Sequence, residues 1–310
     1  MNPIILIHLG QHVPRYILWS ARRVAKHNPG RVIFLADAAI KPRIHGVKVE
    51  QIDSFYSGER FHEFAEGSNI EREFRDGFWL KAAERFFVLA QYMRTSNISS
   101  CWHIESDVLI FSFSKLQERL NQIGSGVFLP RDSKHRAIAS IMYVNSLPTL
   151  ERLLLSLNTH QKLTNEMEML ARFLDADPAG HSLPTADFLD PIYSRKRQWE
   201  SLSIRDIGGV VDAAGMGQWI GGIDPRNSSK RTTNHFRNEV NIINFEKIRF
   251  RFRPSGNTLS AKYGSAPPVE IYNLHLHSKD WLLFASNFAL KLLVTLGNWP
   301  IRLPMRRNPL

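Results

Sequence analysis

Two acidic side chains separated by a single residue carry the clearest chemical signal in this sequence. Glu105 and Asp107 lie in the segment CWHIESDVLIF (101–111), between two short apolar runs. Two carboxylates this close repel each other unless a cation neutralises them, and hard oxygen donors suit Mg²⁺ or Mn²⁺. The alternative is an acidic turn between two strands, exposed to water. The flanking apolar runs favour a metal site at the end of a strand.

Two histidines near the end of the chain could complete such a site, because a cation held by two carboxylates usually gains a further ligand. In VEIYNLHLHSK (269–279), strand alternation places Asn273, His275 and His277 on one face and apolar residues on the other. The alternative is that one of the histidines is a packing residue. The alternation predicts one polar face and one face that belongs to the core.

Alternating strand and helix patterns must position the acidic pair. We expect a strand over Ile4–His8, a helix over Tyr16–Lys26 and a second strand over Arg31–Ala36. This β-α-β unit predicts a parallel sheet with a right-handed crossover. A long helix, Trp79–Arg94, then leads to a strand at Cys101–Ile104. Since the carboxyl ends of parallel strands line the ligand crevice of an open α/β sheet, the acidic pair should lie in that crevice.

The acidic pair resembles the Asp-x-Asp motif of GT-A fold glycosyltransferases. The string ERFFVLAQYM (84–93) followed by HIESD (103–107) looks like a bacterial group related to capsular and outer-chain sugar transferases. The resemblance extends over about residues 1–280 and implies a GT-A-like, Rossmann-type mixed α/β sheet flanked by helices. It also implies a nucleotide-sugar donor and Mn²⁺ or Mg²⁺ held directly by Asp107. Glu105 stands where the family has Asp, and that position often contacts ribose, or the metal through water.

The resemblance assigns roles to residues elsewhere in the chain. It implies that His275 or His277 is a metal ligand, with His277 preferred, and that Lys279 meets the diphosphate. It also implies that the loop His8-Leu9-Gly10, after the first strand, lies near the nucleoside. This loop contains neither a dinucleotide-binding fingerprint nor a Walker P-loop.

Two further charged residues could contact the donor. Asp37, just past the second strand, could accept a hydrogen bond from ribose or base, although an ordinary strand-end turn explains it equally well. Arg85, on the long helix, could offer a bidentate fork to a phosphate or to Asp107. Solvation of Arg85 on the surface is the alternative.

The acceptor side is predicted from a glycine-rich segment. Residues 207–227 suggest a loop packed close to another part of the chain, in which Trp219 could offer an aromatic face to a sugar. Asp212 precedes the second half of this loop, and Glu166 opens a helix for which Thr164 is the expected N-cap. Either acid could be the base that deprotonates the acceptor in an inverting reaction. Whether the reaction inverts or retains stays open.

Composition limits the class of protein. The chain has 310 residues, a formal charge of +11 and one cysteine, Cys101. The charge favours anionic partners such as phosphates, nucleic acid or an acidic membrane face. A lone cysteine allows neither an internal disulfide nor a thiolate zinc cluster. Because the first residues read as a buried strand without a signal-peptide pattern, we expect a cytoplasmic protein, with peripheral association with the inner membrane as an open alternative.

Two basic segments have alternative interpretations. Lys247–Arg253 (KIRFRFR) alternates basic and apolar residues, which predicts an antiparallel strand with a solvated basic face, or a contact to phosphate or nucleic acid. Residues 280–310 are predicted as an appendage to a GT-A-like domain at 1–279, with an apolar helix at 281–296 and a basic tail. That helix is too short and polar for a confident membrane span, so it either docks on an anionic leaflet or packs on the domain.

The leading prediction is therefore a metal-dependent glycosyltransferase that moves a sugar from a nucleoside-diphosphate sugar to a glycan or lipid-linked acceptor. One alternative is a sugar-1-phosphate nucleotidyltransferase, disfavoured because the N-terminal loop lacks the Gly-rich, Arg-containing signature of such enzymes. Another is a non-catalytic, basic nucleic-acid-binding protein that uses the Lys247–Arg253 face. Nucleic acid is the less expected partner.

Overall fold

Predominantly apolar strands form the centre of the molecule. The structure is a computed structural model that describes residues 2–37, 41–111, 113–159, 164–190, 201–224, 226 and 243–298. β1 (Ile4–His8) and β4 (Cys101–Ile104) are parallel neighbours, and nearly all of their side chains are buried. Continuous apolar runs of this kind are typical of strands covered on both faces.

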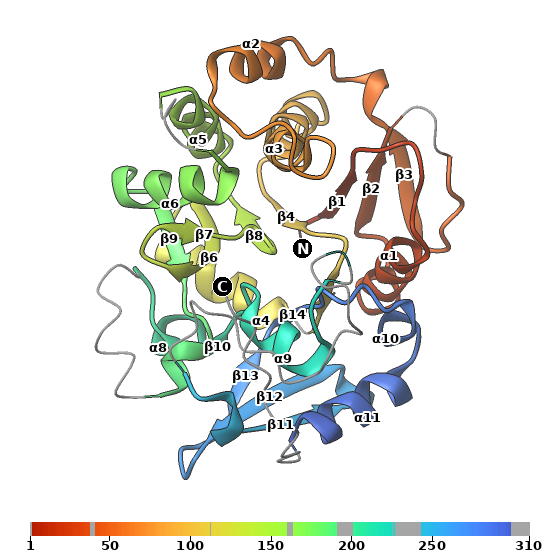
Figure 1. Ribbon diagram of the computed structural model, residues 1–310, viewed down its shortest axis with the longest axis vertical. Coiled ribbons are helices and arrows are strands. Elements are labelled where there is room, and N and C mark those ends of the chain that lie inside the picture. The colour runs from red at the N-terminus through yellow and green to blue at the C-terminus, as the bar shows by residue number, and fades with distance from the viewer. Residues whose placement is uncertain are drawn as a thin grey trace.

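The large sheet has the strand order β3-β2-β1-β4-β8-β6-β7, with β9 paired to β6 (Figure 1). β3, β2, β1 and β4 run parallel to one another, whereas β8 is antiparallel to both β4 and β6. The predicted β-α-β unit and the mixed α/β fold class are thus confirmed. The remaining strands of this sheet are β2 (Val32–Ala36), β3 (Val47–Gln51), β6 (Val127–Ser133), β7 (Arg136–Ala137), β8 (Ile141–Val144) and β9 (Gly180–Leu183).

Helices cover both faces of the large sheet. α1 and α4 pack on one face, where apolar residues one turn apart, such as Ile17, Ala21 and Val24 of α1, point at the strands. α2, α3, α5 and α6 pack on the other face. These helices are α1 (Arg15–His27), α2 (Glu59–Gly67), α3 (Phe78–Thr95), α4 (Ser114–Ile123), α5 (Leu147–Thr159) and α6 (Glu166–Ala176).

A smaller sheet with the order β10-β13-β12-β11 builds the other end of the molecule (Figure 1). A separate pair, β5 and β14, runs antiparallel, and the ladder continues in a hydrogen bond from the Leu276 amide to the Asp107 carbonyl at 2.8 Å. This pairing brings the late histidines to the acidic motif. The elements are β5 (Val108–Ile110), α8 (Ile204–Ile207), β10 (Gly209–Val210), α9 (Gly215–Gly221), β11 (Ile248–Arg253), β12 (Thr258–Tyr263), β13 (Val269–Ile271) and β14 (Asn273–His275).

Three predicted elements are wrong in detail. The strand expected up to His277 is divided into β13 and β14, which belong to different sheets. The segment 207–227, expected as a loop, contains β10 and α9. The N-cap of α6 is Asn165 rather than Thr164, because the Asn165 side chain accepts a hydrogen bond from the Glu168 amide at 3.1 Å.

The helix predicted at 281–296 is two helices, α10 (Trp281–Ala285) and α11 (Asn287–Gly297). α10 packs on α1 and α11 packs on β11, with Phe284 and Leu290 buried in the core between them. Of the two alternatives, packing on the domain holds for this segment, while the basic tail lies outside the described residues. None of the helices described here is long and apolar enough to cross a membrane. The domain boundary at residue 279 stays a prediction.

Candidate functional site

The acidic pair lies where the chain leaves the centre of the large sheet. Glu105 and Asp107 follow β4 directly, in a tight turn in which the Val108 amide donates to the Glu105 carbonyl at 3.1 Å. The Glu105 amide donates to the carbonyl of Ser140 at 3.0 Å, which ties the turn to the segment before β8. Each carboxylate side chain is 15% exposed. Both acids therefore lie at the carboxyl end of a central strand, as predicted.

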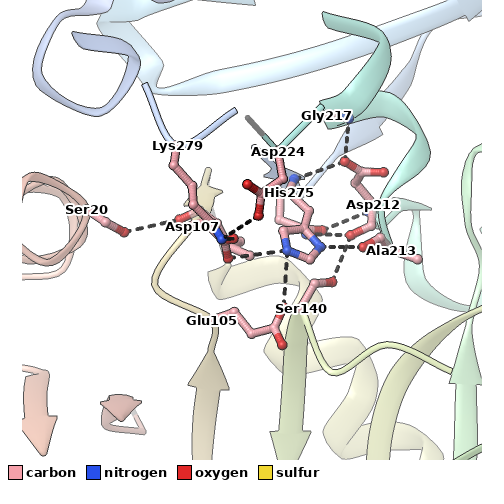
Figure 2. A network of polar contacts seen from close by, with 12 residues as sticks. Ser20, Glu105, Asp107, Ser140, Asp212, Ala213, Gly217, Asp224, His275 and Lys279 are labelled. Atoms are coloured by element: carbon pink, nitrogen blue, oxygen red, sulfur yellow. Dashed lines mark hydrogen bonds and ion pairs between the residues drawn. The ribbon is translucent and has the colours of Figure 1, made fainter. Parts of the chain in front are cut away.

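His275 lies between the two carboxylates (Figure 2). Its Nε2 atom is 3.2 Å from Glu105 and 3.3 Å from Asp107, while its Nδ1 atom is 2.6 Å from the carbonyl of Ala213 and so carries a proton. Burial alone would lower the pKa of His275, but Asp107 and then Glu105 outweigh it and raise the pKa to about 9. One potential ligand atom from each residue lies within 4.8 Å of the others, so the three groups could hold one metal ion.

Asp212 holds His275 in place. Its carboxylate accepts hydrogen bonds from the amides of His275 at 2.9 Å, Gly217 at 2.6 Å and Met216 at 2.9 Å. Its backbone exchanges two hydrogen bonds with the Asn273 side chain, both at 2.9 Å. Because the carboxylate is buried and joins α9 to β14, this geometry favours a positioning role for Asp212 over the predicted role of base.

Gly217 allows α9 to approach β14 this closely. A Cβ atom at Gly217 would lie 1.9 Å from the carbonyl oxygen of His275. Only a residue without a side chain fits there, which is the close packing expected for this glycine-rich segment. Trp219 of α9, by contrast, is buried and stacks on Phe245 with ring centroids 5.6 Å apart. The prediction of Trp219 as a sugar-facing platform is therefore wrong.

His277 lies beside the cluster rather than between the carboxylates. Its ring is 4.1 Å from the ring of His275, measured between centroids. Burial and then the charge of His275 lower the pKa of His277 to about 3, so the ring is neutral. Its Nε2 atom is buried without a hydrogen-bond partner among the described residues. The structure thus places His275 closer to the two acids, although sequence reasoning preferred His277.

Arg85 links the acidic motif to Glu166. The Arg85 guanidinium forms an ion pair with Glu105 and lies 3.6 Å from Glu166 at the start of α6. The alternative of a solvated surface position is wrong, because the Arg85 side chain is only 13% exposed. Its partner is Glu105 rather than the predicted Asp107, and a contact to phosphate stays a prediction. Burial raises the pKa of Glu166 to about 7 against the opposing charge of Arg85. One oxygen of Glu166 is buried without a partner among the described residues.

Three cations surround a buried carboxylate next to Asp107. Asp224 accepts ion pairs from Arg226 at 2.7 Å, Lys279 at 3.1 Å and Arg75 at 3.3 Å. Lys279 also lies 3.8 Å from Asp107 (Figure 2). Arg75 and Lys279 have φ of 49° and 55°, in the left-handed region that costs a residue with a side chain about 1 kcal/mol or more. Such strain is common at functional sites.

Sequence reasoning found Lys279 but missed this group of cations as a unit. Asp224 and Arg226 fall within the segment 207–227, which the sequence predicts as an acceptor loop, and no local pattern distinguishes Arg75 from the other arginines. Tyr16, at the start of α1, was also missed, and its ring lies 6.0 Å from the Lys279 ammonium. No spacing signal connects these residues, because they come from four distant parts of the chain.

The residues predicted to lie near the nucleoside occupy the same carboxyl edge of the sheet. His8 ends β1, and its ring lies 2.9 Å from the carbonyl of His12 within the following loop. Asp37 follows β2, and its amide donates to the His8 carbonyl at 3.3 Å. Leu9 packs against the core, and Gly10 has only the His8 ring near its missing Cβ. A role for these four residues in nucleotide binding stays a prediction.

No model of a known protein family matches the chain, and no curated protein matches its sequence. Its fold is similar to those of several solved glycosyltransferases at low sequence identity. Mouse xyloside xylosyltransferase 1, in its apo form, has a TM-score of 0.42 and 11% identity over 65% of this chain and 94% of that one. Galactosyltransferase LgtC, in complex with donor and acceptor sugar analogs, has a TM-score of 0.40 and 14% identity over 65% and 84%. GlyE of Streptococcus pneumoniae has a TM-score of 0.39 and 11% identity over 66% and 52%.

Proposed function

We propose that this protein is a metal-dependent glycosyltransferase that moves a sugar from a nucleoside-diphosphate sugar to a glycan or lipid-linked acceptor. The observation that carries the proposal is the position of two carboxylates and a histidine beside a group of three cations. Glu105, Asp107 and His275 suit a divalent cation. Lys279 lies beside both Asp107 and Asp224, and Asp224 also forms ion pairs with Arg75 and Arg226. A metal site next to surplus positive charge matches a magnesium- or manganese-bound diphosphate.

The donor set fits Mn²⁺ or Mg²⁺. Glu105 and Asp107 supply hard oxygen atoms, and His275 supplies its Nε2 atom once its proton leaves. The buried, unpartnered Nε2 atom of His277 lies next to this set and is a further candidate ligand. A bound divalent cation supplies Lewis-acid stabilisation of the negative charge that develops on a leaving diphosphate.

The surrounding residues have separable tasks in this proposal. Lys279, Arg75 and Arg226 bind the diphosphate oxygens, for which guanidinium groups offer bidentate geometry. Arg85 holds Glu105 in position and keeps Glu166 close. Glu166, whose pKa is near neutral and which has an unpartnered oxygen, can accept the proton of an acceptor hydroxyl if the reaction inverts configuration.

A thermal-shift screen of nucleoside-diphosphate sugars, with and without Mn²⁺, tests the proposal. We expect at least one sugar nucleotide to raise the melting temperature of the wild-type protein only when Mn²⁺ is present. Asp107→Asn should abolish this Mn²⁺-dependent shift and remain folded, because it preserves the shape of the side chain and removes a metal-binding charge. Asp53→Asn, at an exposed acid, is the matched control and should behave like the wild type.

Two results would contradict the proposal. A folded Asp107→Asn protein that keeps its Mn²⁺-dependent shift would exclude this metal site. A shift with nucleoside triphosphates, together with pyrophosphate release from a triphosphate and a sugar 1-phosphate, would instead identify a nucleotidyltransferase. Nucleotide-sugar turnover to a glycosylated acceptor separates the two activities directly.

A further inference from the structure

The outer face of β11 carries a straight row of arginines. Along this strand Ile248, Phe250 and Phe252 are buried and Arg249, Arg251 and Arg253 are exposed, as the basic and apolar alternation predicts. Residues two positions apart in a strand are about 6.8 Å apart. β11 is an edge strand of the smaller sheet, so the row lies at the border of the molecule, at the opposite end from α2 (Figure 1).

Arg249, Arg251, Arg253 and Lys262 outnumber the acid that the ladder places on the same face, Glu270 of β13, which lies opposite Ser260. Within the described part of the chain, Arg251, Arg253 and Lys262 form no ion pair, and Arg249 donates only to the backbone carbonyls of Glu246 and Ile248. Lys262 of β12 lies directly opposite Arg249 in the ladder, which adds a like charge to the same face. The residues of β12 opposite Arg251 and Arg253 are Ser260 and Thr258, which are neutral. Like charges on one exposed face raise its affinity for an anionic surface.

The neighbouring helix α11 extends the basic border and adds one exposed leucine. A cavity of about 400 Å³ at this border is lined by Arg251 and Arg253 of β11 and by Lys291 and Thr295 of α11. Leu292, next to Lys291, is 50% exposed. The sequence that follows α11 contains Arg302, Arg306 and Arg307 and no acidic residue. Cations next to exposed leucine resemble the composition of surfaces that lie on acidic bilayers.

We infer that the outer face of β11, defined by Arg249, Arg251, Arg253 and Lys262, docks on an anionic lipid bilayer. A single-stranded nucleic acid fits this face less well, because such ligands require aromatic platforms and both phenylalanines of β11 point into the core. Anionic head groups need only closely spaced cations. The inference does not depend on the proposed function, since none of these four residues belongs to the metal or diphosphate site.

Co-sedimentation of the full chain with vesicles tests this inference. Phosphatidylcholine vesicles with and without phosphatidylglycerol are compared at low and high salt. We expect the wild-type protein to bind only the anionic vesicles and to dissociate at high salt. The triple variant Arg249→Gln, Arg251→Gln, Arg253→Gln should bind about a hundredfold more weakly, from about 1 kcal/mol for each basic residue near an acidic leaflet. Its melting temperature should be unchanged, because the three side chains are exposed.

A control variant removes the same charge elsewhere. Lys41→Gln, Arg43→Gln, Arg172→Gln changes three exposed cations outside the smaller sheet and should leave vesicle binding within a few-fold of the wild type. Equal losses in the two triple variants would show that net charge alone matters and would overturn the inference. The inference is also overturned if the wild-type protein does not bind anionic vesicles. It is overturned as well if the triple variant Arg302→Gln, Arg306→Gln, Arg307→Gln abolishes binding while the β11 variant does not. Binding of a DNA duplex that depends on the β11 arginines, without vesicle binding, would assign the face to nucleic acid.

Discussion

Replacing Gly217 by alanine should weaken metal binding although Gly217 contacts no metal. The added Cβ would lie 1.9 Å from the carbonyl oxygen of His275 and 2.9 Å from a carboxylate oxygen of Asp212. Because atoms of this kind rarely approach within 3.0 Å, α9 and β14 must separate by about 1 Å. His275 is attached to this contact through its own amide, which donates to Asp212 at 2.9 Å.

The expected magnitude follows from that displacement. Overpacking of a buried contact costs about 1–3 kcal/mol of stability. The Nε2 atom of His275 is only 3.2 and 3.3 Å from Glu105 and Asp107, so a shift of about 1 Å disturbs the whole ligand set. Loss of a group that orients a metal ligand typically lowers metal affinity about 10–100-fold. We expect Gly217→Ala to show both effects together.

Isothermal titration with Mn²⁺ and a thermal melt of the metal-free protein measure the two effects. Gly67→Ala is the matched control, because Gly67 ends α2 and nothing lies within 4 Å of its missing Cβ. This control should bind Mn²⁺ like the wild type. Gly217→Ala with a lowered melting temperature but unchanged Mn²⁺ affinity would refute the coupling between α9 and His275. If Gly217→Ala does not fold, Asp212→Asn tests the same coupling, because it loses acceptor capacity without adding volume.

Four further outcomes are expected. Asp224→Asn should lower the free energy of unfolding by about 1.5–3 kcal/mol, because three partly exposed cations lose their shared carboxylate. Pyrophosphate should raise the melting temperature of this variant more than that of the wild type, and equal shifts would contradict this. Burial lowers the pKa of His181 below its ordinary 6.5, so the unfolded chain binds the proton more readily and stability should fall as the pH drops through 6.5. Between pH 7.5 and 5.5 the urea midpoint should therefore decrease less in His181→Phe than in the wild type. An equal decrease in the two proteins would contradict this. Burial also raises the pKa of the Cys101 thiol, which should react with a thiol reagent only after denaturation; rapid labelling of the native protein would contradict its burial. Truncation after Lys279 should lower the melting temperature or cause aggregation, because it exposes the core that Phe284 and Leu290 cover; an unchanged melt would favour a detachable appendage.

Local patterns were sufficient for the elements that build the large sheet. The runs Ile4–His8 and Cys101–Ile104 are apolar and short, and each forms a buried strand with the predicted bounds. The alternation in Lys247–Arg253 likewise predicted which side chains of β11 point outward. These predictions succeed because hydrophobic periodicity depends only on neighbours in the sequence. The positions of Glu105 and Asp107 at a strand end follow from the same reasoning.

Long-range contacts decided the composition of the site. The choice of His275 over His277 as the neighbour of the acids depends on the pairing of β14 with β5, two segments more than 150 residues apart in the sequence. Asp212 is predicted as a possible base from the sequence, but its carboxylate accepts hydrogen bonds from the amides of His275 and Gly217, which favours a positioning role.

The sequence by itself therefore determined the fold class, the central strands and the acidic motif, because those depend on local side-chain pattern. Only the tertiary structure decided which histidine faces the carboxylates and that Arg75, Arg226 and Lys279 share Asp224. The physical reason is that electrostatic contacts act over a few ångströms in space regardless of separation along the chain. Whether a carboxylate binds a metal, accepts a proton or positions a neighbouring side chain depends on the groups that folding places around it.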